Sequence, residues 1–320
     1  MKNFRTLDLN LLRVFDTLMS EGSLTRAADV LSLTQPAASH ALKRLHAWVG
    51  EPLFQRSAVG MTPTARAVAL WPSVRSALMA LQQTLAPTDF DPARDAIEFH
   101  VTMAAAAAAT LAPGMVRALV AAQAVADLRI LPLTTRDPRA LLHDGLADLA
   151  IGDFPALLSA LVTEGDRALV RHLPLHRTDY VCVMRRGHPL ADGELTLDRY
   201  CAAQHVLVTV SGQAHAEIDE ALALLGRRRR VLITVNQYTT AGQVITQSDL
   251  VTVLPASFVP SVASRQALVT RPLPVTIAPL TLEMVWLARR DAEPAHRWLR
   301  DAAQAAAGFA SEAAAAPPRG

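Results

Sequence analysis

A basic stretch near the N-terminus carries side chains whose types and spacing suit contact with DNA. Gln35 and Ser39 are short and offer hydrogen-bond donors and acceptors, which is what reading base edges in a groove requires. Lys43 and Arg44, with Arg56 further along, supply positive charges for phosphates, which position a protein without specifying sequence. The alternative is an ordinary three-helix bundle with a solvated basic face, and periodicity alone does not decide between the two.

Three predicted helices within residues 8–48 would position these side chains. The first repeats apolar residues every three or four positions, and Gly22 and Ser23 suit the end of one helix and the start of the next. Thr34 suits the start of the third helix, and Pro36 is tolerated in its first turn, where an N–H has no helical partner. The polar outer face of the third helix then presents Gln35, Pro36, Ser39, His40 and Lys43.

A hairpin and a longer helix follow this segment. Residues 50–63 form short extended pieces around Gly60, a pattern typical of a hairpin. A helix is predicted from about residue 64 to 86, and Pro72 should kink it or mark an early turn. Residues 86–92 hold two prolines and two acids, which indicates a linker.

Beyond the linker, apolar runs alternate with helix-compatible segments. The runs lie at residues 97–103, 128–133, 147–151, 180–184, 205–210, 231–235 and 250–254. Strands that alternate with helices predict parallel sheets in an α/β fold. About 210 residues of this pattern suit two lobes better than one.

The charge is divided unevenly along the 320 residues. Residues 1–86 contain nine Lys or Arg and five acids, a balance of +4, whereas the rest contains 22 basic and 24 acidic residues, a balance of −2. A basic segment on a slightly acidic body indicates a polyanionic partner for one end only.

Length and composition argue against membrane and disulfide-rich classes of protein. The apolar run at residues 103–116 is shorter than the about 20 residues that a bilayer-spanning helix needs, and no signal peptide is indicated. Cys182 and Cys201 cannot form a disulfide framework, and two reduced thiols are the simpler interpretation. We therefore expect a cytoplasmic protein.

Enzyme, cofactor and metal sites lack support in the sequence. No Gly-x-Ser-x-Gly, Walker or Gly-x-Gly-x-x-Gly motif is present. His172 and His176 are four residues apart, but Pro174 between them spoils the helix that would align them on a metal. The four arginines at residues 227–230 are predicted to be a solvated loop, with contact to DNA or a second subunit as the alternative.

Residues 7–66 resemble the winged helix-turn-helix domain of the LysR-type transcriptional regulators. Several motifs in the family's order and spacing carry the resemblance: residues 8–12, 22–28, 33–39, 42–45, 52–56 and 62–64. Many members have a glutamate where this chain has His46 or Ala47, a difference that follows the recognition surface.

The resemblance implies that Gln35, Pro36, Ser39 and Lys43 face the major groove, and that Arg56 reaches the phosphates or the minor groove. For the helix at residues 64–86, it favours a partner helix over an intramolecular core. The partners implied are double-stranded DNA, further copies of this chain in a dimer and then a tetramer, and RNA polymerase. We expect no membrane as a partner.

Residues 94–302 resemble the family's effector domain, which has two α/β lobes built like a periplasmic binding protein. Segments at residues 179–201 resemble the regulators of nodulation and aromatic catabolism, which implies a small-molecule effector such as an aromatic carboxylate. The expected divisions are a DNA-binding domain at 1–63, a dimerisation helix and hinge at 64–92, an effector domain at 93–302 with lobe I at 93–165 and 266–302 and lobe II at 166–265, and a mostly disordered tail at 303–320.

In that architecture the ligand lies between the lobes, at the ends of strands and the starts of helices. The positions that correspond here are Thr102, Met103, Ala104, Ala105, Phe154, Ser211, Gly212, His215, Tyr238, Thr239 and Thr240. Relatives usually place a polar residue after the first strand, where this chain has Ala104 to Ala109, so only backbone N–H groups remain there to bind an anion. The alternative function is a solute-binding or enzymatic α/β protein whose N-terminal helices serve only oligomerisation.

Overall fold

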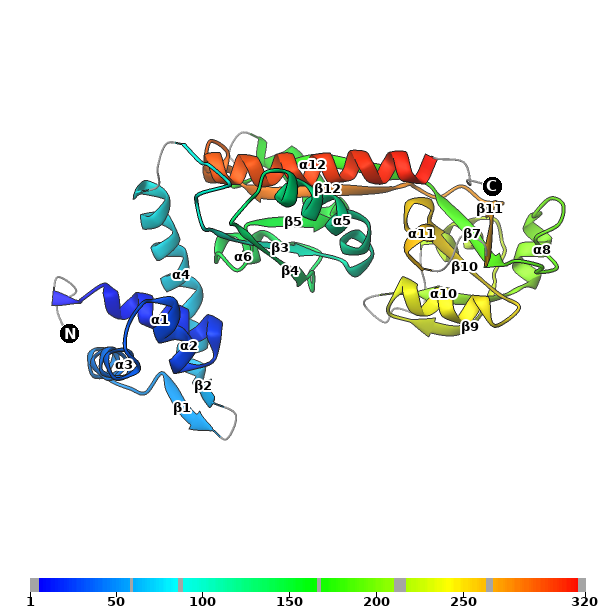
Figure 1. Cartoon of the computed structure of the whole chain (residues 1–320). Coiled ribbons are helices and arrows are strands. Elements are labelled where there is room, and N and C mark those ends of the chain that lie inside the picture. Colours follow the sequence, from blue (N-terminus) through cyan, green and yellow to red (C-terminus); the bar gives the residue numbers. More distant parts are fainter. Residues whose placement is uncertain are drawn as a thin grey trace. The chain divides into compact units, whose positions relative to one another are not determined.

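The computed structural model describes residues 6–57, 60–85, 89–165, 168–209, 217–262 and 267–315 (Figure 1). Its contacts divide the chain into an N-terminal unit, formed by residues 1–88 with the short segment 140–146, and a second unit formed by the remainder.

The N-terminal unit begins with three helices, α1 (Asn10–Glu21), α2 (Leu24–Val30) and α3 (Gln35–Val49). Gly22 ends α1 with a left-handed conformation (φ 63°), and the Ser23 hydroxyl accepts from the Arg26 N–H at the start of α2. Thr34 accepts from the Ala37 N–H at the start of α3. The three predicted caps are confirmed, because each depends on residues that are adjacent in the sequence.

A small core holds these helices together. Its buried side chains include Phe15 and Leu18 of α1, with Leu42 and Leu45 of α3. The predicted hairpin is confirmed as β1 (Phe54–Ser57) and β2 (Gly60–Pro63), which pair antiparallel. The long helix α4 (Ala65–Leu85) follows and packs its first half against the same core.

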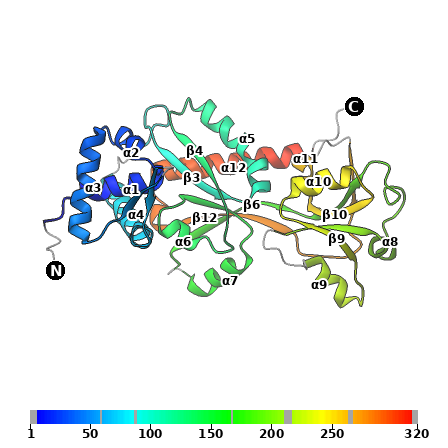
Figure 2. The same cartoon turned by 90° about the horizontal axis from the view of Figure 1, so that it is seen from below.

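Lobe I of the second unit is a five-stranded sheet in the order β4-β3-β5-β12-β6. Its strands are β3 (Glu98–Met103), β4 (Asp127–Pro132), β5 (Leu149–Gly152), β6 (Val170–Thr178) and β12 (Leu280–Leu287). Its helices are α5 (Ala105–Ala121), α7 (Pro155–Glu164) and α12 (Pro294–Ala315), with the 3-10 turn η4 (Ala288–Arg290). The short helix α6 (Arg139–His143) lies almost wholly in the segment grouped with the N-terminal unit. Figure 2 shows α5 and α12 on one side of the sheet and α7 on the other.

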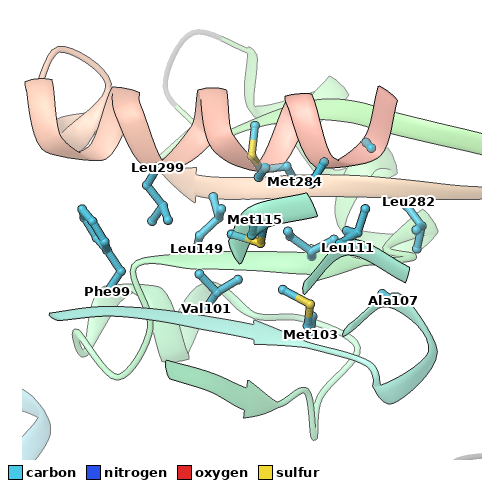
Figure 3. Packing of buried hydrophobic residues seen from close by; sticks show 14 of the residues in the cluster. Phe99, Val101, Met103, Ala107, Leu111, Met115, Leu149, Leu282, Met284 and Leu299 are labelled. Atoms are coloured by element: carbon cyan, nitrogen blue, oxygen red, sulfur yellow. The ribbon is translucent and has the colours of Figure 1, made fainter. Parts of the chain in front are cut away.

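The main core of lobe I lies between this sheet and the helices α5 and α12. Figure 3 shows Val101, Met103 and Leu149 from the strands facing Leu111 and Met115 from α5. All of these side chains are buried, so the sheet and the two helices form one hydrophobic layer.

Lobe II is a second five-stranded sheet, in the order β11-β7-β10-β8-β9. Its strands are β7 (Tyr180–Arg185), β8 (Gln204–Val208), β9 (Arg230–Val235), β10 (Leu250–Pro255) and β11 (Leu268–Pro272). Its helices are α8 (Leu197–Ala202), α9 (Glu217–Leu224), α10 (Tyr238–Thr246) and α11 (Val259–Val262), with the 3-10 turn η3 (Ala256–Phe258).

The predicted lobe boundaries at residues 166 and 265 are wrong. Strand β6 belongs to lobe I, where it pairs antiparallel with β12, and β11 belongs to lobe II, where it pairs antiparallel with β7. Leu273 and Ile277 also pack against the lobe II core. Lobe II therefore extends from about residue 180 to 277, and each sheet is mixed where the sequence pattern predicted parallel strands.

The expected tail at 303–320 is also wrong over most of its length. Helix α12 continues to Ala315, and Ala303, Ala306 and Ala307 are buried against lobe I. Small side chains explain this, because Gly114 of α5 and Ala306 approach so closely that a Cβ built on Gly114 would lie 2.6 Å from the Ala306 Cα. An alanine-rich composition here marks close helix packing.

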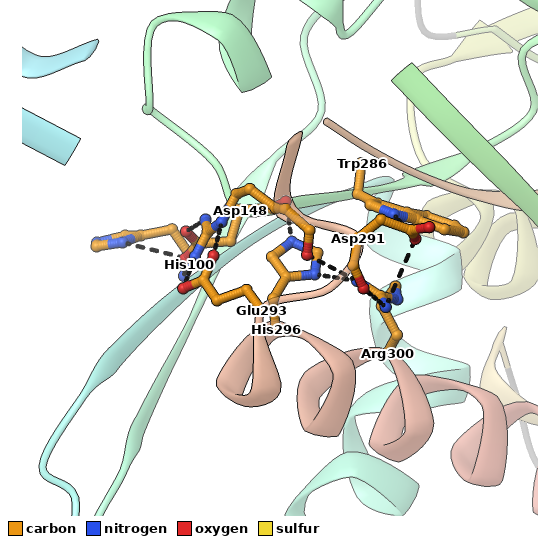
Figure 4. A network of polar contacts seen from close by, with 8 residues as sticks. His100, Asp148, Trp286, Asp291, Glu293, His296 and Arg300 are labelled. Carbon is orange, nitrogen blue, oxygen red and sulfur yellow. Dashed lines mark hydrogen bonds and ion pairs between the residues drawn. The ribbon is translucent and has the colours of Figure 1, made fainter. Parts of the chain in front are cut away.

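A buried polar network fastens the start of α12 to the sheet (Figure 4). Arg290 pairs with Asp148, and the His296 Nε2 donates to the Asp148 carbonyl at 2.9 Å. The His296 Nδ1 accepts from Arg300 at 2.8 Å, and the Arg300 guanidinium lies 4.8 Å from the Trp286 ring centroid. Burial, reinforced by the charge of Arg290, lowers the pKa of His296 to about 4.

Candidate nucleic-acid interface and ligand site

The outer face of α3 presents the predicted DNA-contacting residues to solvent. Gln35, Pro36, His40 and Lys43 are exposed, and Ser39 is half-buried. They share a face because α3 turns Ala38, Leu42 and Leu45 into the core, as the helical period requires. The face is therefore free to approach a groove.

Two other predicted residues have partners of their own. The Arg44 guanidinium lies 3.2 Å from the Asp8 carboxylate, and both side chains are partly exposed. Thr34 is committed to the cap of α3, which fixes where the recognition face begins. Arg56 lies in β1 opposite Met61, and its side chain lies outside what the structure describes.

The predicted ligand positions after β3 divide into buried and accessible residues. Thr102 is 1% exposed and donates to the Pro132 carbonyl, and Met103 is part of the core. Ala104 begins α5 with no side-chain cap, and Ala105 is exposed. The first N–H groups of this helix are therefore left for a ligand or solvent.

Positions on the neighbouring elements differ in the same way. Phe154 is fully buried and lies against Gly152, so it supports the predicted ligand positions from within the core. Tyr238 is half-buried at the start of α10, with its ring 5.7 Å from that of Phe258, and Thr239 is exposed beside it while Thr240 is half-buried. The predicted positions Ser211, Gly212 and His215 lie outside the described residues.

Acidic residues that the sequence reasoning missed lie near these positions. Asp153 follows β5, and Glu283 of β12 is paired with the adjacent Gly152. Burial raises the pKa of Asp153, and the charges of Glu217 and Glu283 raise it further. Glu283 is almost fully buried, and the His172 Nδ1 lies 3.0 Å from its carboxylate.

A second tyrosine belongs to the same neighbourhood. Burial raises the pKa of Tyr180, and the charges of Tyr238, Glu217 and Asp153 act in the same direction. The two phenols therefore stay protonated and can donate hydrogen bonds. The sequence did carry one usable signal, since Asp153 directly follows an apolar strand, where ligand-binding side chains gather in α/β folds.

Within the described ranges, no cluster of three His, Cys, Asp or Glu side chains is placed to hold a metal ion. Cys182 and Cys201 are free thiols, and burial raises the pKa of each. No helix of the described chain has the length and apolarity that crossing a membrane requires.

The run of arginines at 227–230 is not uniformly solvated as predicted. The Arg229 side chain is 1% exposed and forms a two-point contact with Asp219 of α9, with N–O distances of 2.7 and 3.0 Å. It also donates to the Tyr200 hydroxyl at 3.3 Å. Arg229 therefore joins α8, α9 and β9 inside lobe II.

Two family models match the chain. The model described as "Bacterial regulatory helix-turn-helix protein, lysR family" matches residues 9–68, and the model described as "LysR substrate binding domain" matches residues 93–308. The first spans the three helices and the hairpin, and the second spans both lobes and most of α12.

Individual proteins are similar over nearly the whole chain. The transcriptional activator NahR of Pseudomonas putida is 32% identical over 297 residues, covering 92% of this chain and 96% of that protein. Nodulation protein D 1 of Rhizobium leguminosarum bv. phaseoli is 31% identical over 301 residues, covering 93% and 92%. A crystal structure described as a probable transcriptional regulator from Pseudomonas aeruginosa has a TM-score of 0.74 at 29% identity, covering 94% of this chain and 97% of that one.

Proposed function

This chain belongs to the LysR family of bacterial transcriptional regulators, and we propose that it recognises its operator through the outer face of α3 and responds to a small aromatic effector. It is a DNA-binding regulator with an effector-binding domain, and it is not an enzyme. The observation that carries the proposal is the exposed polar row on α3, which the Thr34 cap and the buried Ala38, Leu42 and Leu45 hold in place.

The DNA-reading role predicts two different responses to substitution. Gln35→Ala should relax base preference and cost about 1–3 kcal/mol at the base that is read. Lys43→Ala should weaken binding to all sequences and reduce the salt slope by about 1, because one phosphate contact is lost. Fluorescence anisotropy with selected and scrambled duplexes, titrated over salt, separates the two responses. An unchanged base preference in Gln35→Ala would show that α3 is not the reading element.

We place a second copy of this chain against α4. Val68 is 55% exposed and Leu81 is 49% exposed on this helix, and exposed apolar side chains of this kind are ones that a partner helix would cover. A dimer doubles the DNA half-sites that are read, and pairing of dimers gives the tetramer. Leu81→Glu should shift the protein toward monomer in sedimentation. An unchanged oligomeric state would contradict this assignment.

We further place the protein in the cytoplasm with the DNA, where it can meet RNA polymerase.

The effector site is proposed where α5 begins, close to Asp153, Tyr180 and Tyr238. The uncapped start of α5 suits a carboxylate, while the oxygens of Asp153 suit a group that donates a hydrogen bond. Both needs are met by a hydroxylated aromatic carboxylate. Ser211, Gly212 and His215 remain part of the proposed site.

Thermal shift with benzoate and its hydroxylated derivatives tests the effector class. A ligand at one hundred times its dissociation constant adds about 2.7 kcal/mol to stability. Hydroxybenzoates should raise the melting temperature more than benzoate does, and Asp153→Asn should shrink that difference. Equal shifts for all these ligands in the unsubstituted protein would contradict the role given to Asp153.

A further inference from the structure

Helix α4 has a proline in its interior. Pro72 lacks the N–H that would donate to the carbonyl of Val68, so one backbone hydrogen bond of the helix is missing there. The interruption lies within the part of the helix that packs on the N-terminal core, because Ala67 and Leu70 before the proline and Val74 after it all contact that core. An α-helix bends most readily at such a point.

Side chains on both sides of this proline are tied to α1. The Trp71 Nε1, just before it, donates to the Asp16 Oδ1 at 2.7 Å. The Arg75 Nη1, one turn later, lies 3.4 Å from the same carboxylate oxygen and donates to the Ser20 Oγ at 2.9 Å. The Arg75 guanidinium also lies 5.5 Å from the Trp71 ring centroid.

These contacts are largely buried and charge-assisted, so they can hold α4 firmly against α1. The Arg75 side chain is only 14% exposed and that of Asp16 is 23% exposed, so solvent and salt screen their attraction weakly. Hydrogen bonds to a carboxylate are about twice as strong as neutral ones. By contrast, the Arg66–Glu51 pair at the start of the same helix has both side chains half exposed and contributes little.

We propose that the Asp16–Trp71–Arg75 contacts hold α4 at a fixed angle to α1. This angle then sets which half-site spacing the regulator accepts. Helix α1 packs against α3 in one core. Contacts that fix α4 to α1 on both sides of Pro72 therefore also fix the angle between α4 and the outer face of α3, which is proposed to read the DNA. In a dimer joined through α4, that angle sets the distance between the two reading helices. The inference therefore rests on the α4 dimer of the proposed function.

The test uses operators selected from random DNA by the full-length protein. A series of duplexes then keeps both half-sites and changes their separation by one or two base pairs in either direction. Binding is measured for the unsubstituted protein, for Asp16→Asn, which keeps the side-chain shape, for Trp71→Phe, which keeps an aromatic ring but removes the indole N–H, and for the control Arg66→Ala. Melting temperature and sedimentation confirm that each variant is folded and keeps the oligomeric state of the unsubstituted protein.

The unsubstituted protein and Arg66→Ala should lose tenfold or more in affinity when the spacing changes. Asp16→Asn and Trp71→Phe should lose less than threefold over the same series, while the affinity for the best spacing changes by only a few fold. If Asp16→Asn and Trp71→Phe are folded and still lose tenfold or more in affinity when the spacing changes, the inference is wrong even though the regulator binds DNA. If the unsubstituted protein shows no specific DNA binding or no dimer, the proposed function itself fails, and the inference with it.

Discussion

The arginines at positions 227–230 show how far one residue type can differ in role over four positions. Arg229 is buried in its pair with Asp219, whereas Arg227 pairs with Asp198 on the surface, where both side chains are largely exposed. The sequence pattern predicted a solvated loop for all four. The difference arises from α9, which brings Asp219 to Arg229, and no local pattern contains that contact.

Substitution at these two positions should have very different effects on stability. Arg229→Met removes the arginine from its pair with the mostly buried Asp219, and breaking such a pair costs about 3–5 kcal/mol. Arg227→Met removes only an exposed pair, which contributes about 0–1 kcal/mol. Urea unfolding followed by circular dichroism measures both. A loss below about 1 kcal/mol in Arg229→Met would contradict the structural role given to this residue.

The candidate site was only partly predictable at the scale of residues. The caps Ser23 and Thr34 and the exposed face of α3 follow from local spacing, and the structure places them as expected. The acidic neighbourhood did not follow, because Asp153 and Glu217 come from different lobes and meet only in the folded chain. Motif resemblance names positions, but it does not state which of them, like Phe154, are buried beneath the surface.

At the scale of elements, the strands predicted from compact apolar runs were found, whereas β6, β11 and β12 were missed. Strand β12 is buried along nearly its whole length, and its residues 280–287 mix apolar, polar and charged types in no clean alternation. Strand β6 contains Pro174, which pairs with Glu283 directly beside the register shift between Leu282 and Glu283. Both signals contradict a simple two-residue period, so the sequence pattern left these segments unassigned.

The close approach of α5 and α12 gives a prediction at this scale. Gly114→Ala would place its Cβ 2.6 Å from Ala306, so the two helices must separate, and overpacking of this kind costs about 1–3 kcal/mol. Gly308→Ala in α12 is the matched control, because nothing lies within 4 Å of its new Cβ and alanine favours helix by about 1 kcal/mol. Chemical denaturation should show opposite signs for the two variants. Stabilisation by both would mean that the helices pack less closely.

At the scale of the whole molecule, both lobes carry a histidine that resists protonation. Burial lowers the pKa of His205 in lobe II and of His296 in lobe I from 6.5 to about 4. At a pH between about 4 and 6.5, these histidines bind protons in the unfolded chain but not in the folded chain. Stability is therefore complete above pH 6.5 and should fall as the pH drops toward 4, by about 1 kcal/mol per pH unit for each histidine.

Urea midpoints at pH 7, 6 and 5 measure this dependence above the range in which most carboxylates titrate. His205→Gln should flatten the slope, whatever it does to the absolute stability. A midpoint that stays constant from pH 7 to 5 in the unsubstituted protein would contradict the burial argument.

Lobe II is one uninterrupted stretch of chain, from about residue 180 to 277, and lobe I supplies the sequence on both sides of it. Two junctions join it to lobe I, so a chimaera can exchange it with the lobe of a relative as a single cassette. Phe258 belongs to the lobe I core although it follows a lobe II strand, so a working chimaera must keep this side chain matched to its host. Transplanting the cassette would carry Tyr180, Glu217 and Tyr238 together, and would leave Asp153 and Glu283 behind.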